Sequence, residues 1–337
     1  MDKPRVSQGL LIVIVIAAAM MASLSGPHVQ QPATAAGEPP PIEELIPQGE
    51  RADNNFTIRV LHGGSVADMT MEQYLIGVVA AEMPASFEIE ALKAQAVAAR
   101  TNAMYNITVM QKTRHPEAHV CTDASCCTAY KGDGRLREEW GAGYIRSIDR
   151  IISAVIETDG ICMYYEDMPV LAVFHSSSAG QTEASGNVWL NDLPYLLCVS
   201  SPETAENVPG YISAVTVPFD EFASKVLDAY PDAVFGADVK SWIKDTTFTA
   251  SGRVNSLSVG GITIKGTILR SMLGLRSTAV TIDFVGDSIV FTTTGFGHGV
   301  GMSQYGANVM AVSGNDYTEI LSHYYTGVSL VALRTEL

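Results

Sequence analysis

The spacing of apolar residues between 72 and 106 predicts two helices separated by a proline. In the first, apolar residues recur at intervals of three and four from Leu75 onward, which is the spacing of one helix face. Pro84 disfavours the helical conformation in the residue before it, so the first helix is expected to end there. The second helix is expected over 86–105, where many alanines permit close packing against a neighbour.

Glu82 continues the apolar face of the first helix. It lies seven residues after Leu75 and four after Val78, and a carboxylate in that position is costly unless it is paired or neutral. Burial and the negative end of the helix dipole both raise the pKa of such a carboxyl group. A Glu that keeps its proton near neutral pH can act as a general acid. The alternative is an ion pair between Glu82 and a nearby cation such as Arg100.

Strand and helix patterns continue along the chain and predict an α+β fold with a central cleft. Residues 56–61 alternate as a strand that turns at a Gly-Gly pair. A helix is expected over 145–156, followed by a hairpin with strands at 161–165 and 170–174. Further expected elements are helices at 219–230, 239–243 and 268–273, and strands at 256–264, 280–285 and 288–293.

The N-terminal segment predicts a transmembrane helix followed by a tether. Residues 9–24 are sixteen positions without a charge, slightly short of the roughly 20 residues of a membrane span. Lys3 and Arg5 before them favour a cytoplasmic amino terminus with the rest of the chain extracytoplasmic, and a cleaved signal peptide is the alternative. We therefore expect a membrane anchor at 1–25, a proline-rich extended linker at 26–55, and a folded domain at 56–335 with a satellite region near 205–250.

Charge and cysteine content narrow the function classes. The 337 residues carry 21 Lys and Arg against 36 Asp and Glu, a net charge of −15, and the basic residues form no cluster. Nucleic acid is therefore not an expected partner, because phosphate binding requires clustered cations. Five cysteines in a chain of this length do not form a disulfide scaffold.

The segment 115–127 has the composition of a metal site. It holds three of the five cysteines, Cys121, Cys126 and Cys127, and two of the seven histidines, His115 and His119. Thiolate and imidazole together are typical of tetrahedral zinc. Adjacent cysteines both bind one ion only across a sharp turn, so one of them is a candidate bystander. A disulfide or simple loop thiols are the alternatives.

Two polar loops follow predicted strands. The loop His175-Ser-Ser-Ser-Ala-Gly-Gln-Thr-Glu183 is rich in hydroxyl groups and suits sugar hydroxyls better than a catalytic triad, because neighbours on a strand point to opposite faces. The loop from Gly295 has four glycines in seven residues, which let the backbone approach a ligand closely, and His298 and Gln304 are its expected donors. Trp189 has the shape to stack on a sugar ring, although a lone Trp is more often core.

Several motifs closely resemble the stage II sporulation protein D family, the lytic transglycosylases that cut peptidoglycan during engulfment of the forespore. They are EQYLIGVVAAEMPASF, ALKAQAVAARTNA, KGTILRSMLGLRST and GHGVGMSQYGA, and the resemblance covers roughly 56–330. It implies that Glu82 is the catalytic acid and that Arg100 is needed for activity. The expected substrate-binding residues are His175, Ser176, Ser177, Gln181, Thr182, Glu183, His298, Gln304 and Tyr305.

The resemblance also bears on the metal. Some family members hold zinc with a His-x5-Cys-x5-Cys pattern and a histidine just before the last cysteine. His115, Cys121 and Cys127 match that spacing, while Cys126 stands where the second histidine usually lies. The fourth ligand is therefore Cys126 or His119. Four protein ligands would make the zinc structural, because a catalytic zinc keeps one position open.

The resemblance implies a reaction, partners and a location. The reaction is cleavage of the β-1,4 bond between N-acetylmuramic acid and N-acetylglucosamine without water, leaving a 1,6-anhydro ring on glycan already stripped of stem peptides. Hydrolases need a second carboxylate, whereas an internal hydroxyl makes a single Glu sufficient. The implied partners are a sporulation N-acetylmuramoyl-alanine amidase and a membrane protein of the engulfment complex, on the mother-cell side of the septum.

Two other function classes remain open on the sequence. The first is a zinc-dependent wall amidase or peptidase centred on His115, Cys121 and Cys127, although no HExxH motif is present and thiolate-rich sites are usually structural. The second is a noncatalytic wall-binding scaffold that recruits the amidase.

Overall fold

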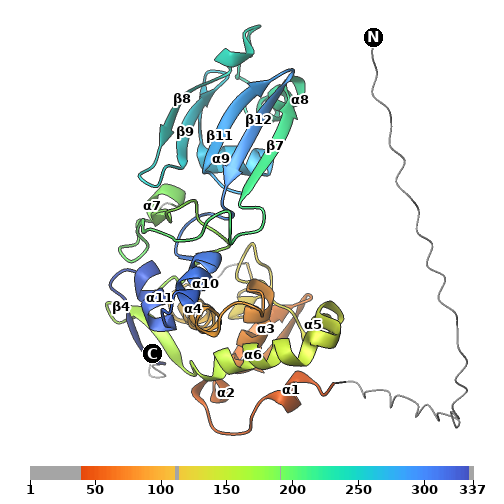
Figure 1. Cartoon of the computed structure of the whole chain (residues 1–337), viewed down its shortest axis with the longest axis vertical. Helices are drawn as coiled ribbons and strands as arrows, with labels where there is room; N and C mark the ends of the chain where they lie inside the picture. Colours follow the sequence, from red (N-terminus) through yellow and green to blue (C-terminus); the bar gives the residue numbers. More distant parts are fainter. Residues whose placement is uncertain (1–38, 111–113, 190, 334–337) are drawn as a thin grey trace, which may run out of the picture. The chain divides into compact units, whose positions relative to one another are not determined.

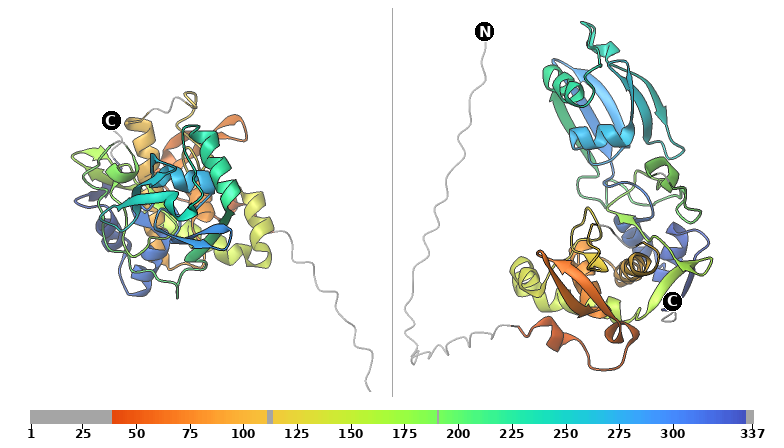
Figure 2. Two further views of the ribbon diagram at one scale, coloured as in Figure 1. Left: turned by 90° about the horizontal axis from the view of Figure 1, so that it is seen from above. Right: turned by 180° about the vertical axis from the view of Figure 1, so that it is seen from behind.

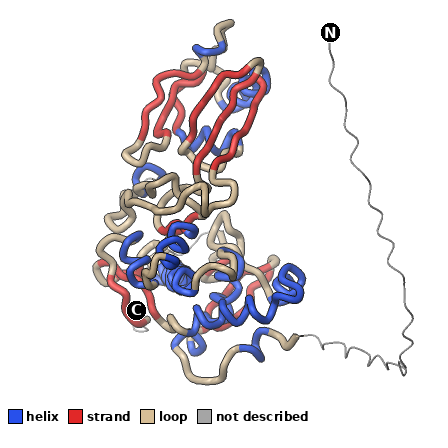
Figure 3. Tube along the Cα trace, viewed as in Figure 1, coloured by secondary structure: helices blue, strands red, loops and turns tan. Residues whose placement is uncertain are grey.

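The computed structural model describes residues 39–110, 114–189 and 191–333 (Figure 1). The predicted membrane anchor at 1–25 and the first half of the predicted linker lie outside these ranges. Within them, no helix combines the length and apolar character that a membrane crossing requires. The elements described below belong to the unit that begins at Pro40, and they mix helices and strands as an α+β fold (Figure 3).

The first core is built around helix α4, Ile89–Thr108. Fourteen of its 20 residues are buried, and many of them are alanines that let neighbouring elements approach closely. The helices packed on it are α3 (Met71–Glu82), α6 (Tyr144–Ile156), α10 (Gln304–Val312) and α11 (Tyr317–Tyr324). Because α10 and α11 come from the C-terminal end of the chain, this core joins segments far apart in sequence (Figures 1 and 2).

The predicted helix break at Pro84 is confirmed. α3 starts at a capping box in which the Thr70 hydroxyl accepts from Gln73 N and the Gln73 side chain accepts from Thr70 N. α3 ends at Glu82, and Met83 is extended, as expected for the residue before a proline. The second helix starts three residues later than predicted, because a turn closed by Phe87 N and Pro84 O precedes it.

Two small sheets flank this core. One has the strand order β2-β1-β3, formed by β1 (Thr57–His62), β2 (Ser65–Thr70) and β3 (Val120–Cys121). The other has the order β14-β4-β5, formed by β4 (Ile161–Tyr165), β5 (Met168–Pro169) and β14 (Ser329–Ala332). The predicted hairpin is confirmed in its first strand and in its turn, where Glu166 and Asp167 both have positive φ, but its second strand is β5 and not the expected 170–174. Shorter helices are α1 (Ile42–Leu45), α2 (Ala52–Asn55), α5 (Asp133–Trp140), η1 (Gly141–Gly143) and α7 (Ser185–Val188).

A second hydrophobic core lies between two three-stranded sheets and two helices (Figure 2). The sheets have the orders β11-β12-β7 and β10-β9-β8. Their strands are β7 (Ile212–Pro218), β8 (Ile243–Phe248), β9 (Val254–Val259), β10 (Ile262–Lys265), β11 (Val280–Val285) and β12 (Ser288–Thr294), and the helices are α8 (Phe219–Ala229) and α9 (Gly266–Leu273).

The predicted satellite region near 205–250 is too short. β7 pairs along its whole length with β12, so the second core extends to the end of β12. The expected helix at 239–243 is only the 3-10 turn η2 (Val239–Ser241), after which the chain enters β8. The pairing of β7 with β12 could not be predicted from the local sequence pattern, because the two strands are about seventy or more residues apart in the chain.

The prediction of an extended linker is wrong for the part of 26–55 that the structure describes. Residues 42–45 and 52–55 form α1 and α2, and Ile42 belongs to the first core. Arg51 forms an ion pair with the buried Glu72 at 2.6 Å. Asp53 is 1% exposed and pairs with Arg100. The proline content suggested a tether, but these long-range ion pairs fix the segment onto the folded domain.

Candidate functional site

A cavity of about 550 Å³ brings together the motifs that the sequence analysis singled out. Strand β6 (Phe174–His175) and strand β13 (Met302–Ser303) pair in parallel at its wall, so the two polar loops lie side by side. We call this cavity the groove. Its lining residues are Glu82, Asn102, Ala124, Cys127, Thr128, Val173, Phe174, His175, Ser176, Arg270, Phe296, Gly297, His298 and Gln304.

Glu82 supplies the only carboxyl group among the described residues that line the groove. It is the last residue of α3 and is half-buried. Burial raises its pKa above the ordinary value of 4.5, against two hydrogen bonds that lower the pKa. The direction agrees with the expectation for a carboxyl group on the apolar face of a helix.

The two oxygens of Glu82 have different surroundings. Oε1 accepts a hydrogen bond from the backbone N of Ala129 at 2.8 Å. Oε2 lies 3.5 Å from Nε2 of Gln304, which also lies 3.4 Å from Oε1 of Gln95. Because Oε1 already accepts a short N–H bond, the proton of the neutral acid belongs on Oε2. That oxygen is the one next to the groove residue Gln304.

His175 and His298 both line the groove, and both form hydrogen bonds within the protein. His175 Nδ1 bonds the backbone oxygen of Val300 at 3.1 Å and Nε2 bonds Ser178 Oγ at 2.7 Å, so both nitrogens are occupied within the protein. Burial and the neighbouring His298 lower the pKa of His175 well below its usual value. His175 therefore shapes the groove and has no nitrogen left for substrate.

His298 is a neutral imidazole beside it, with a ring-centroid distance of 5.6 Å. Its Nδ1 accepts from Val300 N at 3.1 Å, which assigns the proton to Nε2. Burial and the charge of Arg270 lower the pKa of His298 to about 4, so the ring is uncharged at neutral pH. Trp189 lies 5.3 Å from the same ring and is 38% exposed, but it belongs to a neighbouring cavity. Its role as a sugar platform stays a prediction.

The glycine-rich loop is tightly packed against strand β6 and the residue before it, Val173. Gly301 has φ of +71°, and a Cβ there would lie 2.1 Å from the backbone oxygen of Val173. Gly297 has φ of +117°, and a Cβ there would lie 2.7 Å from Cβ of His175. Both positions therefore require glycine. The close approach places His298 and Gln304 at the groove.

Five of the predicted substrate-binding residues do not line the groove. Thr182 is buried with its hydroxyl bonded to the backbone of Leu197 and Val199, and Ser177 is buried beneath the loop. Gln181 is exposed, and its backbone oxygen accepts from Arg253.

Glu183 and Tyr305 are likewise occupied elsewhere. Glu183 Oε2 accepts from Thr249 and Ser251, at 2.6 and 2.7 Å, and so ties its loop to the turn between β8 and β9. Tyr305 packs its ring against Phe87 at 5.0 Å. These two side chains support the fold around the groove, Glu183 from the loop after β6 and Tyr305 from the first turn of α10.

Arg100 is not a partner of Glu82, so the ion pair considered above is wrong. Its side chain is 0% exposed and donates to Asp53 through Nε and Nη2, the latter at 2.5 Å. Further bonds reach the backbone oxygens of Ile161 and Val155. Arg100 and the groove residue Asn102 are two positions apart on α4, about 200° around the helix, and they face different sides. Its role in activity stays a prediction.

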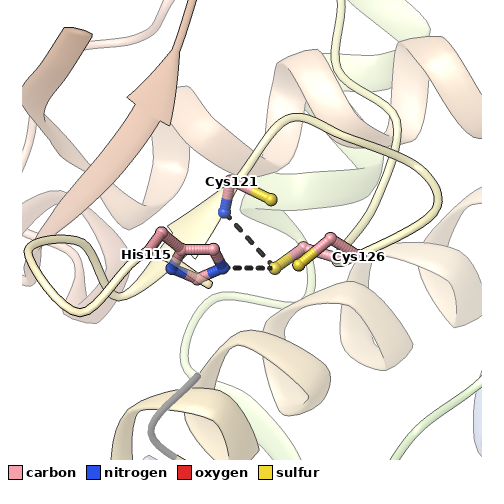
Figure 4. Close-up of side chains that lie close together, drawn as sticks. His115, Cys121 and Cys126 are labelled. Atoms are coloured by element: carbon pink, nitrogen blue, oxygen red, sulfur yellow. Dashed lines mark hydrogen bonds between the residues drawn. The ribbon is translucent and has the colours of Figure 1, made fainter. Parts of the chain in front are cut away.

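The predicted metal ligands form one cluster (Figure 4). The ligand atoms of His115, Cys121, Cys126 and Cys127 all lie within 4.8 Å of one another. Cys127 Sγ lies 3.5 Å from His115 Nε2 and accepts from Cys121 N at 3.3 Å. No disulfide joins the cysteines, all of which lie within the described ranges.

This donor set fits zinc. Tetrahedral bond lengths of about 2.0 Å to nitrogen and 2.3 Å to sulfur place the two atoms about 3.5 Å apart, which is the His115–Cys127 distance. His115 Nδ1 bonds the backbone oxygen of Ala118, so Nε2 is the nitrogen that faces the sulfurs. His119 bonds Arg59 through both nitrogens and lies outside the cluster, so Cys126 is the candidate fourth ligand.

The metal loop and the groove are continuous. Ala124, Cys127 and Thr128 line the groove, and Ala129 donates to Glu82. The loop that carries the metal ligands thus also supplies the hydrogen bond that orients the acid. A structural metal at this place would hold the backbone N–H of Ala129 in position.

Sequence reasoning missed several groove residues. Asn102 and Arg270 lie within the motifs ALKAQAVAARTNA and KGTILRSMLGLRST, which were recognised as wholes without assigning these two positions. Thr128 and Phe296 carry no comparable signal. Of these, Arg270 is the only cationic side chain.

Comparison with known proteins gives consistent matches. Residues 62–165 match the family model described as "SpoIID: Stage II sporulation protein". The chain is 39% identical over 266 residues to the stage II sporulation protein D of Bacillus amyloliquefaciens, covering 79% of this chain and 75% of that protein. It is 38% identical over 269 residues to the stage II sporulation protein D of Bacillus subtilis (strain 168), covering 79% and 76%. An amidase enhancer of the same Bacillus subtilis strain is 28% identical over 309 residues, covering 77% of this chain and 40% of that protein.

Proposed function

This chain belongs to the SpoIID family of stage II sporulation proteins, and we propose that it is a lytic transglycosylase acting on peptide-free peptidoglycan glycan in engulfment. The bond cleaved is the β-1,4 bond between N-acetylmuramic acid and N-acetylglucosamine. The product is a 1,6-anhydromuramyl end.

One observation carries the proposal: Glu82 is the single carboxyl group among the described groove residues, and burial raises its pKa. Hydrolysing glycosidases need two carboxyl groups, one for the leaving group and one for water or the covalent intermediate. A reaction that uses a hydroxyl of the substrate itself needs only one. A half-buried Glu82 whose pKa is raised by burial suits that chemistry.

The reaction then follows in two proton transfers. Glu82 donates the proton on Oε2 to the glycosidic oxygen, the C1–O bond breaks, and N-acetylglucosamine departs with its new hydroxyl. The C6 hydroxyl of the same muramyl sugar attacks C1, and Glu82 takes back its proton. Between the two transfers Glu82 is a carboxylate, and the Ala129 N–H stabilises that charge.

Zinc has a structural role in this proposal. Bound by His115, Cys121, Cys126 and Cys127, the ion would have four protein ligands and no open position for water. The zinc-dependent amidase therefore remains the weaker alternative.

A membrane location and an amidase partner complete the proposal. The uncharged stretch at 9–24 would anchor the chain at the cell membrane, with the folded domain outside the cytoplasm. An amidase that strips stem peptides would supply the substrate, together with a membrane partner of the engulfment complex. The similarity to a protein named amidase enhancer supports a shared pathway with an amidase.

Glu82→Gln tests the reaction. Gln keeps the size of the side chain but cannot donate the proton, so release of anhydromuramyl sugars from peptide-free glycan should fall at least a hundredfold, a typical contribution of general acid–base catalysis being about 10²- to 10⁴-fold. Mass spectrometry of the digest measures it. Unchanged release of anhydro sugars would exclude the mechanism. Activity that survives in the variant but is lost with a chelator would favour the amidase. Binding of glycan without any turnover in the wild type would favour the noncatalytic scaffold.

A further inference from the structure

Arg270 is a groove side chain whose charge is balanced by no acidic residue in the part of the chain that the structure describes. It is the one Arg or Lys among the described residues that line the groove, lies in the last turn of α9, and is half-buried. Within the described ranges its only side-chain hydrogen bond runs from Nε to the backbone oxygen of Leu275, at 3.2 Å. No Asp or Glu of those ranges forms an ion pair with it within 4.0 Å.

The surroundings of Arg270 are neutral rather than negative. Burial lowers the pKa of Arg270, with no carboxylate acting in the opposite direction. The charge of Arg270 acts on the two groove histidines: together with burial it lowers the pKa of both His298 and His175. A half-buried cation without a counter-ion is costly to the fold. An anionic ligand in the groove would remove that cost.

A purely structural role would leave most of the hydrogen-bond donors of Arg270 without a partner among the described residues. Arg270 stands near the C-terminal end of α9, where the helix dipole favours a cation, and its Nε bond to Leu275 helps to close the helix end. That bond employs one of the five N–H donors of a guanidinium. The two terminal nitrogens stay available, and their planar arrangement matches both oxygens of a carboxylate.

The chemistry of the substrate supplies such a carboxylate, and here the inference rests on the proposed function. N-acetylmuramic acid carries a lactyl ether at C3. In intact peptidoglycan the lactyl carboxyl group is an uncharged amide to the stem peptide. After the peptide is removed it becomes a free carboxylate, which is the only anion on the glycan strand.

Glu82 and Arg270 reach the groove from different parts of the fold. Glu82 comes from α3 in the first core and Arg270 from α9 in the second, and both line the same cavity. On a pyranose ring C1 and C6 lie toward one edge and C3 toward the other. With C1 and C6 at Glu82, the lactyl group extends away from Glu82 and can meet a groove residue that comes from another element, such as Arg270.

We propose that Arg270 binds the free lactyl carboxylate of N-acetylmuramic acid and thereby selects glycan from which the stem peptides have been removed. Arg270 is then a specificity residue, distinct in role from Glu82. The amidase product is recognised by the charge that amide hydrolysis creates, in addition to any relief of crowding.

The test compares two glycans that differ only in that charge. One is a peptide-free oligomer of alternating N-acetylglucosamine and N-acetylmuramic acid. The other is the same oligomer with every lactyl carboxyl converted to a methylamide. The wild type should cleave the carboxylate form with a kcat/KM roughly tenfold or more above that of the methylamide, as expected for a charge-assisted bidentate bond. The preference should weaken as salt is raised.

Arg270→Gln should bring that ratio close to one, mainly by slowing cleavage of the carboxylate form, and Arg270→Lys should keep part of it. Arg276→Gln is the matched control. Arg276 bonds the backbone oxygen of Gly210 and lies over the Phe296 ring, but it does not line the groove, so the wild-type ratio should persist. Thermal unfolding of each variant checks that it is folded.

Binding separates this inference from the proposed function. Calorimetry with the Glu82→Gln protein and both oligomers measures recognition without turnover, and adding Arg270→Gln should remove the preference for the carboxylate. Failure of the wild type to form anhydro sugars from either glycan would overturn the proposed function, while the binding ratio would still test Arg270. A wild-type ratio that survives in folded Arg270→Gln, or a wild type without any preference, would overturn the present inference.

Discussion

Helix α4 contributes residues to two regions with buried or half-buried charges, and the two regions differ in whether those charges are paired. On one side Arg100 is 0% exposed and Asp53 is 1% exposed, and the two are joined by several short hydrogen bonds. On the other side the groove holds Glu82 and Arg270, which form no ion pair with each other or with any other described residue. The first region neutralises its charges internally, whereas the second leaves them available.

The difference separates structural from chemical roles. A buried pair such as Asp53–Arg100 is costly to break but has no donor or acceptor left for a ligand. An unpaired acid whose pKa is raised by burial can exchange a proton, and an unpaired guanidinium can bind an anion. Both regions contain residues from motifs shared with the family, so motif membership alone does not distinguish them.

The largest expected effect comes from breaking the paired region. Asp53→Asn leaves the fully buried Arg100 without its counter-ion and should lower the free energy of unfolding by about 3–5 kcal/mol. Urea denaturation followed by fluorescence or circular dichroism measures it. Glu221→Gln is the control, because Glu221 pairs with Lys225 at an exposed site and should change stability by no more than about 0.5 kcal/mol.

A double variant sharpens this point. Asp53→Leu with Arg100→Met removes both charges and should recover part of the lost stability, although the backbone oxygens of Ile161 and Val155 lose their donors. If the family requirement for this arginine is structural, the folded double variant should retain turnover. A well-folded double variant without activity would show that Arg100 takes part in the chemistry.

The next effect concerns the loop that supports Glu82. Cys121→Ser removes one of the four candidate ligands and should lower the zinc content well below one ion per chain. Loosening the loop weakens the Ala129 N–H bond to Glu82, and a bond to a charged group is worth about 1.5 kcal/mol or more, so kcat should fall about tenfold. Metal analysis and glycan digestion measure the two quantities.

Cys198→Ser is the matched control for that loop. Cys198 bonds the side chain of Gln181 and lies outside the metal cluster, so zinc and turnover should both persist. A Cys121→Ser protein that loses the metal and keeps full kcat would separate the metal loop from catalysis.

The smallest effect is a gain in stability at the acid itself. Burial raises the folded-state pKa of Glu82 above 4.5, so its contribution to stability is present below pH 4.5 and is lost as pH rises through the folded-state pKa. Gln does not titrate. Glu82→Gln should therefore be more stable than wild type near pH 8 by roughly 1 kcal/mol, and the difference should vanish below pH 4.5. Unfolding free energies at several pH values test this, and a variant less stable than wild type at pH 8 would contradict it.

Much of the local structure was predictable from the sequence. Apolar spacing and Pro84 predicted the two helices and the break between them, and the turn at Glu166 and Asp167 lies within the predicted hairpin. The composition of 115–127 predicted a His and Cys cluster, which the structure brings together. These features depend on contacts between residues that are no more than about a dozen positions apart, and sequence patterns are informative at that range.

The failures involve partners far away in the chain. The linker prediction missed Asp53 because its partner Arg100 is 47 residues away. The loop prediction assigned Glu183 to substrate, but Thr249 and Ser251 occupy its carboxylate. In both cases the identity of the residue as polar does not tell whether its partner is a ligand or another part of the protein.

The sequence by itself determined the pair of helices on either side of Pro84, the place of Glu82 on a buried helix face, and a set of His and Cys residues in one loop. These follow from periodicity, proline and ligand chemistry, which act locally. Only the tertiary structure decided which charges are paired, because α2 covers Arg100 while no acidic segment approaches Arg270 in the described part of the chain. Pairing depends on elements that meet in space after folding, and it separates the structural ion pair from the groups available to a substrate.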